Sequence, residues 1–346
     1  MPTPPNNPCN AEARKRSTRG LTERSVFAVE TVFARALPLV LAFALIWACI
    51  GTAYGLVISL TAPDGSPEQI PATAFRPDGP GPFPAVVILH DCSGLGSKSS
   101  GAPGRWAQEL MQQGYFVLVP DSFSTRGHAD GVCTDPSRSR TQVNPYRRVR
   151  DAYAALAYVR TLPFVDGRRV GLMGGSHGGS ATLASIVAPE SDAEPLARER
   201  RAGFAAAVAL YPGCASPLGS WHANLSGVYK PVAPLLILIG EKDDWTPAEP
   251  CRRLTEAARA AGYPVAIKVY PGAYHSFDSY TPVRYIAARV NANSATGRGA
   301  TTGGDPNAWA DSIREIAAFF GRQLMQMERP GSDEQLVPLA EPLPNR

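Results

Sequence analysis

The sequence predicts an α/β fold, with a mostly parallel central sheet and helices on both of its faces. Uninterrupted apolar runs rich in β-branched residues, such as Ala85–Leu89 and Leu235–Ile239, are typical of strands buried on both sides. Between such runs, segments such as 146–162 repeat apolar residues at three- and four-residue steps, which indicates amphipathic helices. Because the two patterns alternate along the chain, we expect helical crossovers between parallel strands.

The same patterns place each element along the chain. Strands are expected over 54–62, 67–76, 85–89, 115–119, 169–173, 204–210, 235–239 and 266–270, with the first two paired at the sheet edge. Helices are expected over 104–113, 146–162, 180–187, 247–261 and 307–325. Residues 120–145 are too long for an ordinary connection, which predicts a functional loop over a pocket. The Ser, Thr, Gly and Asn content of 291–304 predicts a flexible insertion.

Composition and charge indicate a globular protein without a polyanionic partner. The 346 residues are 44% apolar and 18% charged, which is typical of a folded chain. Residues 1–53 hold six Lys and Arg against three Glu, so this segment supplies three of the formal net charge of +4 and leaves about +1 elsewhere. We therefore expect neither nucleic acid nor an anionic membrane surface as a partner.

Residues 1–53 are expected to be a targeting segment. An Arg-rich stretch ends at Arg35, and an uncharged apolar run follows to Ala53, where small residues favour cleavage by signal peptidase. Cleavage there would make the protein periplasmic or secreted. An uncleaved membrane anchor through Leu60 and a lipoprotein acylation site at Cys49 are the alternatives. One catalytic domain is then expected over 54–328, followed by a flexible Pro-rich tail over 329–346.

Four cysteines follow the targeting segment: Cys92, Cys133, Cys214 and Cys251. In an oxidising compartment they allow three complete pairings. We favour a Cys214–Cys251 bond, because both cysteines are expected on loops beyond the carboxyl ends of adjacent strands. Buried free thiols are the alternative. No cysteine spacing resembles a zinc site.

A nucleophile elbow is predicted at Ser176. The run Gly174–Gly179 reads Gly-Gly-Ser-His-Gly-Gly and lies between a predicted strand and a predicted helix. A sharp strand-to-helix turn strains the central residue and leaves no room for side chains two positions away, which the glycines at 174 and 178 satisfy. A glycine-rich turn with an incidental serine is the alternative interpretation.

Two later motifs complete a Ser-Asp-His order. Asp243 follows the strand expected at 235–239, and His275 follows the last expected strand. His275 would take the proton of the Ser176 hydroxyl, and Asp243 would hold the imidazole tautomer and stabilise the imidazolium. Asp244 competes with Asp243 for this role, with capping of the following helix as its other interpretation.

An oxyanion hole is expected from two backbone amides. The strand at 85–89 leads into a loop of small residues, from which we assign the amide of Cys92. The second donor is the amide of His177, directly after the nucleophile.

These motifs resemble the dienelactone hydrolase family of α/β-hydrolases. The resemblance covers about Ile70 to Phe320, and the loop Cys92–Leu95 is especially similar to exported bacterial members. It implies an α/β-hydrolase fold and a monomeric, cofactor-free and metal-free hydrolase of esters or lactones. It also aligns Asp243, rather than Asp244, with the triad carboxylate.

The chain departs from that family at three positions. The founding enzymes carry a cysteine where this chain has Ser176, and a glutamate where it has Asp91, for which support of the loop is the plain interpretation. They also grip a substrate carboxylate with two arginines. Arg126 matches one, but Ser279 stands at the position of the other, so an anionic lactone substrate is in doubt. Arg126 and Trp245 are the candidate substrate contacts.

Three functions are compatible with this pattern. The first is hydrolysis of a carboxylic ester or lactone, a small-molecule substrate, through an acyl-enzyme. The second is a serine peptidase of the prolyl-oligopeptidase type, but the chain is too short for the N-terminal propeller that such enzymes usually carry. The third is a catalytically silent envelope protein that uses the fold for binding.

Overall fold

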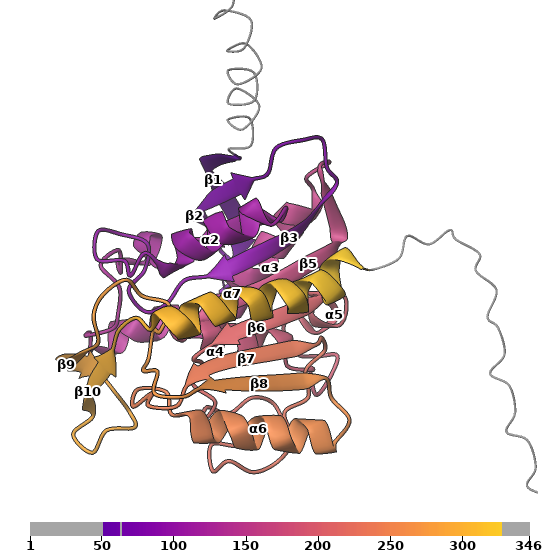
Figure 1. Ribbon diagram of the computed structural model, residues 1–346. Coiled ribbons are helices and arrows are strands. Elements are labelled where there is room, and N and C mark those ends of the chain that lie inside the picture. Colours follow the sequence, from indigo (N-terminus) through magenta and orange to yellow (C-terminus); the bar gives the residue numbers. More distant parts are fainter. Residues whose placement is uncertain (1–50, 63, 327–346) are drawn as a thin grey trace, which may run out of the picture. The chain divides into compact units, whose positions relative to one another are not determined.

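The computed structural model describes residues 51–62 and 64–326, which centre on one eight-stranded sheet. Its spatial order is β1-β2-β4-β3-β5-β6-β7-β8 (Figure 1). The six strands from β4 to β8 run parallel, whereas β1 and β2 pair antiparallel with their neighbours. The strands are β1 Thr52–Thr61, β2 Pro67–Arg76, β3 Phe83–Leu89, β4 Phe116–Pro120, β5 Val165–Gly175, β6 Ala206–Leu210, β7 Leu235–Gly240 and β8 Val265–Tyr270. The predicted α/β fold with a mostly parallel sheet is confirmed.

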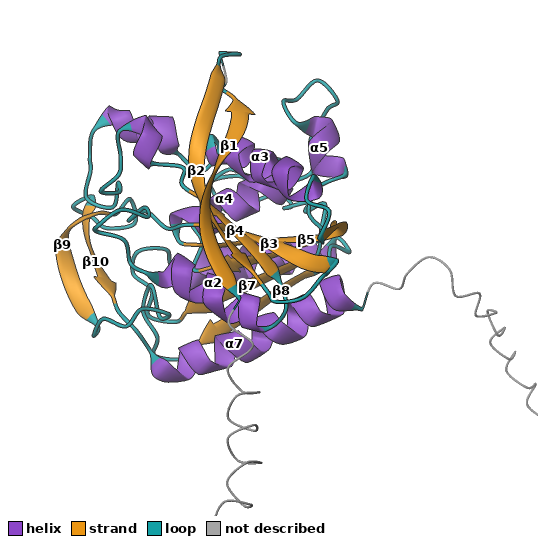
Figure 2. Cartoon of the chain, turned by 90° about the horizontal axis from the view of Figure 1, so that it is seen from above, coloured by secondary structure: helices purple, strands orange, loops and turns teal. Residues whose placement is uncertain are grey.

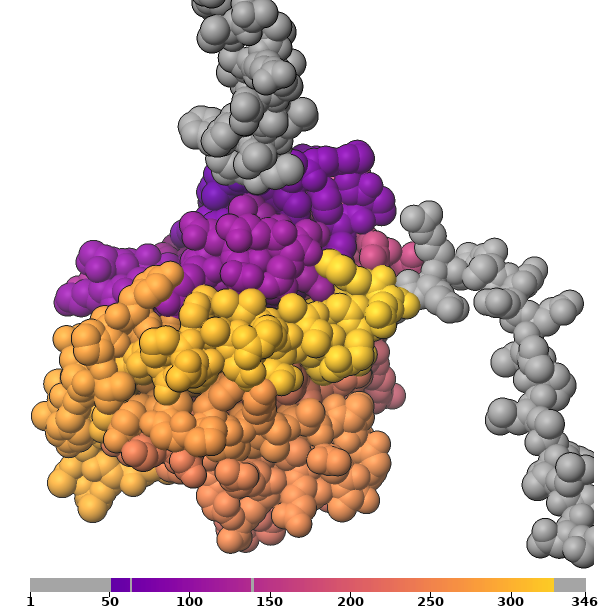
Figure 3. Space-filling view, in the orientation of Figure 1, coloured from indigo at the N-terminus to yellow at the C-terminus, as the bar shows by residue number. Residues whose placement is uncertain are grey.

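Helices cover both faces of this sheet (Figure 2). On one face α2 and α7 lie side by side (Figure 3). The rings of Trp106 on α2 and Trp309 on α7 make an edge-on contact, with 4.4 Å between centroids. On the other face lie α3 and α4. The helices are α2 Ala102–Gln112, α3 Arg148–Arg160, α4 His177–Ile186, α5 Ala197–Arg201, α6 Ala248–Ala260 and α7 Pro306–Phe320, the last followed by a π-helical turn.

Burial explains why the central strands read as apolar runs. Every residue of β4, β6 and β7 is buried, because helices cover both sides of these strands. β1, at the sheet edge, is largely exposed. Because the six strands from β4 to β8 are parallel, their carboxyl ends lie at one rim of the sheet, where α/β folds bind their ligands.

A hairpin replaces the flexible insertion expected at 291–304. β9 (Arg284–Val290) pairs antiparallel with β10 (Arg298–Thr302), so the expectation was wrong at 298–302, whereas 291–297 form the loop between the two strands. The polar side chains that suggested flexibility bind backbone and carboxylate groups instead. Asn291 Nδ2 donates to the carbonyls of Gly299 at 2.7 Å and Asp244 at 3.0 Å. The Asp244 carboxylate accepts the amide and the hydroxyl of Thr301, both at 2.8 Å.

The expected targeting segment and tail fall almost wholly outside the described residues. β1 already begins at Thr52, so the boundary expected after Ala53 lies inside this strand. Among the helices of the described residues, none is long and apolar enough to cross a membrane.

The turn from β5 into α4 packs directly against the end of β3. A Cβ atom on Gly178 would lie 2.0 Å from the carbonyl oxygen of Leu89, and one on Gly174 would lie 2.4 Å from that of Gly178. Both distances are far below van der Waals contact, and the obstructing atoms are backbone. Only glycine therefore fits at these two positions.

This packing predicts the cost of a single methyl group. Gly178→Ala should lower the free energy of unfolding by more than about 2 kcal/mol, because the backbone of β3 must move to relieve the contact. Urea unfolding followed by circular dichroism measures it. Gly55→Ala on β1 is the matched control, since its added Cβ would meet no heavy atom within 4 Å. Equal stability of the two variants would contradict the packing described here.

Candidate active site

Ser176 occupies the turn between β5 and α4, with φ of 54° and ψ of −115°. A positive φ is uncommon for a residue with a Cβ and persists where the surrounding structure enforces it. Here the Ser176 amide donates to the carbonyl of Leu210 on β6 at 2.9 Å. The neighbouring strand and the glycine packing thus hold the serine in a strained conformation at the rim of the sheet.

His275 lies on the loop after β8 and meets this serine. Its Nε2 is 2.9 Å from the Ser176 hydroxyl oxygen, and its side chain is completely buried. The imidazole packs against the rings of Tyr211 and Trp245, with centroids at 4.7 Å and 4.8 Å. Its carbonyl accepts the amide of Gly303 at 3.0 Å, just beyond β10. The ring is therefore fixed by aromatic packing and by the hairpin.

Asp243, on the turn after β7, holds the other imidazole nitrogen. Its Oδ2 is 2.8 Å from His275 Nδ1, while Oδ1 accepts the amides of Trp245 at 3.0 Å and Thr246 at 2.8 Å. The Thr246 hydroxyl lies 3.0 Å from Oδ2. Asp244 is directed to Thr301 in the hairpin and caps no helix. The structure thus brings Asp243, and not Asp244, to His275.

Behind the imidazole lies a buried polar group that the sequence patterns did not indicate. The hydroxyl of Tyr211 donates to Asp278 at 2.8 Å, and Trp106 Nε1 donates to the other oxygen of that carboxyl at 2.8 Å. Burial raises the pKa of Asp278, and burial together with this carboxylate raises that of Tyr211. Tyr211, whose φ is 37°, therefore presents its ring to His275 from a fixed position.

A pocket of about 230 Å³ opens beside Ser176. Cys92, His177 and Trp245, the two predicted oxyanion residues and a predicted substrate contact, are among the residues that line it. Val290 of the hairpin also lines it, and Trp245 Nε1 donates to the Val290 carbonyl at 2.8 Å. The sequence patterns missed this wall, because they predicted no strand over 284–290 and indicated flexibility over 291–304.

Arg126, the other candidate substrate contact, is not among the residues lining this pocket. Its guanidinium makes a bidentate contact with Asp151, both N–O distances being 2.7 Å, and pairs with Glu68 at 2.6 Å. The side chain is 5% exposed. The structure therefore gives Arg126 a structural ion pair in place of the expected substrate contact.

A different arginine lies beneath the site. Arg148 Nη1 donates to the carbonyl of His90 at 2.8 Å and lies 2.9 Å from His177 Nδ1. The side chain is completely buried, and burial lowers its pKa to about 10, so it remains cationic at neutral pH. Burial, followed by this cation, lowers the pKa of both His90 and His177. Both imidazoles are therefore neutral, and His177 Nδ1 is available to accept from Arg148.

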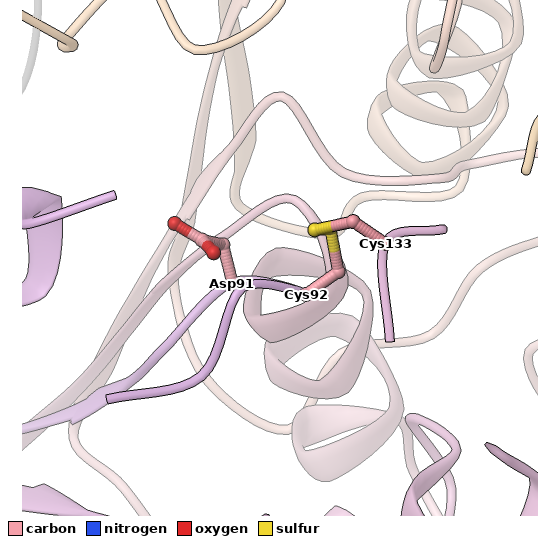
Figure 4. A group of neighbouring side chains, drawn as sticks. All are labelled: Asp91, Cys92 and Cys133. Carbon is pink, nitrogen blue, oxygen red and sulfur yellow. A yellow bond between two sulfur atoms is a disulfide. The ribbon is translucent and has the colours of Figure 1, made fainter. Parts of the chain in front are cut away.

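Two disulfides join the cysteines of the described residues. The favoured Cys214–Cys251 bond is present, together with Cys92–Cys133. Figure 4 shows Asp91 beside the Cys92–Cys133 bond. Atoms of Asp91, Cys92 and Cys133 that could ligate a metal lie within 4.8 Å of one another, but the sulfurs are bonded to each other and provide no thiolate. Asp91 instead supports its own loop, accepting the amide of Ser93 at 2.7 Å.

The chain is similar to known proteins over most of its length. The sequence model of the dienelactone hydrolase family matches residues 70–322. A protein of Methylorubrum extorquens named "Putative carboxymethylenebutenolidase" is 27% identical over 217 residues, which cover 62% of this chain and 70% of that protein. One from Bradyrhizobium sp, named "Probable 2-oxo-3-(5-oxofuran-2-ylidene)propanoate lactonase", is 24% identical over 222 residues, 62% of this chain and 84% of that protein.

A solved structure from Klebsiella pneumoniae subsp. pneumoniae, titled "Putative Dienelactone Hydrolase", shares the fold. It superposes with a TM-score of 0.55 at 21% identity and covers 78% of this chain and 99% of that chain. The family match spans β2 to the end of α7 and so includes the serine, the carboxylate and the imidazole. This chain therefore belongs to the dienelactone hydrolase family, within the α/β-hydrolase superfamily.

Proposed function

We propose that this protein is a serine hydrolase that cleaves a carboxylic ester or a lactone through an acyl-enzyme intermediate. The observation that carries the proposal is a continuous hydrogen-bonded series. The Ser176 hydroxyl oxygen is 2.9 Å from His275 Nε2, and Nδ1 of the same ring is 2.8 Å from Asp243. Nucleophile, base and orienting carboxylate at these distances are the arrangement of a Ser-His-Asp hydrolase.

Proton transfer in this arrangement follows from the partners of the imidazole. Asp243 accepts a hydrogen bond from Nδ1–H, which leaves Nε2 unprotonated to take the Ser176 proton as the oxygen attacks the carbonyl carbon. The negative charge that forms on the carbonyl oxygen is stabilised by the amides of Cys92 and His177. His275 then gives its proton to the departing alkoxide, and the acyl group stays on Ser176.

Deacylation repeats the sequence with water. His275 takes a proton from a water molecule, the hydroxide attacks the acyl carbon, and Ser176 leaves with the proton that the imidazole returns. With a lactone the alcohol remains attached to the acyl group, so one product leaves. No step requires a cofactor or a metal.

The substrate class is supported by the relatives and by the pocket. One relative is named as a carboxymethylenebutenolidase and another as a lactonase. The pocket beside Ser176, of about 230 Å³, suits a small acyl or alcohol group. A peptidase and a silent binding protein are the competing functions. Covalent labelling distinguishes the silent protein from the two enzymes, and parallel assays of esters and of peptide amides distinguish the esterase from the peptidase.

Export is part of the same proposal. Two disulfides within the described residues are expected of an oxidising compartment such as the periplasm. The Arg-rich lead and apolar run within residues 1–53 point to the same location.

The first prediction concerns the nucleophile. Ser176→Ala should lower kcat on p-nitrophenyl acetate at least about 10⁴-fold, because no oxygen remains to form the acyl-enzyme. A fluorophosphonate probe should label the wild-type protein at Ser176 alone, as measured by peptide mass spectrometry. Unchanged thermal unfolding of the variant is the control for folding. Comparable turnover in the variant would exclude this mechanism.

The second prediction separates two neighbouring carboxylates. Asp243→Asn should lower kcat by about 10⁴-fold, since the amide disfavours the required tautomer of His275. Asp244→Asn, the matched control, should keep kcat within the same order of magnitude because Asp244 binds the hairpin. Steady-state kinetics on one short ester measures both variants. A larger loss of kcat in Asp244→Asn would reverse the assignment.

A further inference from the structure

We propose that the Cys92–Cys133 disulfide is a positioning element of the oxyanion hole. In this account the bond fixes the backbone amide of Cys92 at the pocket, and breaking it in the folded protein lowers kcat far more than it changes KM. The inference rests on the proposed function, since it concerns an amide that has a role only in that reaction.

The bond links two loops at the mouth of the site. Cys92 follows the end of β3 by three residues, and Cys133 belongs to the long connection after β4. Figure 4 shows the bond between them, and their Cα atoms are 5.0 Å apart. Both residues line the pocket that contains Ser176 and His177. The disulfide is therefore part of the wall against which a substrate carbonyl would lie.

Secondary structure does not hold the Cys92 loop in place. Residues 90–100 contain no helix or strand. Backbone contact with the Cys133 loop supplies part of the restraint, because the Val132 amide donates to the Cys92 carbonyl at 2.7 Å. A Cβ on Gly131 would lie 2.5 Å from the same carbonyl oxygen. The two loops thus pack backbone against backbone, and the disulfide is their covalent link.

A small apolar cluster, separate from the main core, packs around this part of the wall. Cys92 is buried there with Phe123, Val132 and Val143, and Cys133 packs against them. Cys133 also lines both the 230 Å³ pocket and a second pocket of about 340 Å³. A small cluster bordered by two pockets has fewer partner atoms than the main core to resist displacement, so the covalent bond adds to the restraint that packing supplies.

The far end of the bond is itself anchored. The Cys133 carbonyl accepts the amide of Val290 at 2.9 Å, and Arg289 Nη1 lies 4.0 Å from Cys92 Sγ. The guanidinium of Arg289 also lies 4.9 Å from the centre of the Trp245 ring. The hairpin therefore holds the Cys133 loop in place, and the disulfide bonds Cys92 to that restrained loop.

The Cys214–Cys251 disulfide provides a matched control. Cys214–Cys251 closes a sequence separation of 37 residues against 41, with the same Cα separation of 5.0 Å. Chain-entropy models therefore predict that the two bonds reduce the conformational entropy of the unfolded chain by similar amounts. Cys214 and Cys251 are buried in the main core and do not line the pocket. Any difference in catalysis between the two bonds reports position rather than stability.

The first experiment compares Cys92→Ala/Cys133→Ala with Cys214→Ala/Cys251→Ala. Alanine keeps the backbone amide, so only its position is changed. Removing an oxyanion donor lowers kcat about 10²- to 10³-fold. We expect displacement of the Cys92 amide to lower kcat on p-nitrophenyl acetate by about tenfold or more, while KM stays within about threefold of the wild-type value. Affinity for a trifluoromethyl ketone, which forms a tetrahedral adduct with serine, should weaken in parallel. The Cys214→Ala/Cys251→Ala variant should keep kcat and the affinity for the trifluoromethyl ketone within about twofold of wild type.

The second experiment keeps the wild-type chain and reduces the folded protein with tris(2-carboxyethyl)phosphine. The disulfide gains two electrons and two protons to give two thiols, while the phosphine takes an oxygen atom from water and becomes its oxide. Cys133 is partly exposed whereas Cys214 and Cys251 are buried, so mild reduction should cleave the first bond selectively. Differential alkylation and mass spectrometry verify this, and EDTA prevents metal capture by the freed thiols beside Asp91.

The outcomes are distinct. Reduction should lower kcat, and reoxidation should restore it. This experiment tests the inference even if the Cys92→Ala/Cys133→Ala variant fails to fold. Equal kcat in the two double variants, an effect on KM alone, or full activity after selective reduction would overturn the inference. If wild-type protein neither hydrolyses esters nor reacts with a fluorophosphonate at Ser176, the proposed function fails instead.

Discussion

The close contact between the start of α4 and the end of β3 is the constraint on which the site depends. Gly178 allows the helix to approach the carbonyl of Leu89 at a distance that any side chain would prevent. Ser176 and His177 immediately precede this contact on one side, and His90 and Cys92 follow it on the other. One backbone packing contact therefore sets the nucleophile and the loop of the proposed oxyanion hole relative to each other.

Buried charge reinforces the same junction from below. A single nitrogen of Arg148 contacts the carbonyl of His90 and the imidazole of His177. A buried cation costs free energy unless its donors are paired, so this arginine is costly to bury and its two contacts through Nη1 restrict the geometry of the junction. Because the imidazoles of His90 and His177 are neutral, neither adds a second positive charge that would repel the guanidinium. The disulfide and the guanidinium therefore restrain the loop at two different residues, Cys92 and His90.

Much of this arrangement could be predicted from the sequence, because it depends on local patterns. Apolar runs located the strands, and the order of Ser176, Asp243 and His275 located three loops at one rim of the sheet. The choice of Asp243 over Asp244 rested on a resemblance, and the structure supplies its physical basis in the turn that directs Asp244 to Thr301. Parallel topology makes such predictions possible, since successive strand ends meet at one edge.

What could not be predicted depends on contacts between distant segments. Arg148 follows an ordinary amphipathic pattern, and only the tertiary structure shows its guanidinium buried beneath the site. The polar composition of the hairpin is equally compatible with solvent exposure, until Asn291 and Thr301 find partners on the Asp243–Asp244 turn. The pairing of Cys92 with Cys133 likewise requires knowing that two loops touch. Arg126 was misjudged for the same reason, because Asp151 and Glu68 are its partners only in the folded chain.

A crystal structure of the protein after reaction with a phosphonate ester would show directly whether the serine and the two amides act on the same group. We expect phosphorus bonded to the Ser176 oxygen and a phosphoryl oxygen within about 3 Å of the amide nitrogens of Cys92 and His177. His275 Nε2 should remain within hydrogen-bond distance of the serine oxygen. A phosphoryl oxygen directed away from both amides, or an adduct on another residue, would contradict the account.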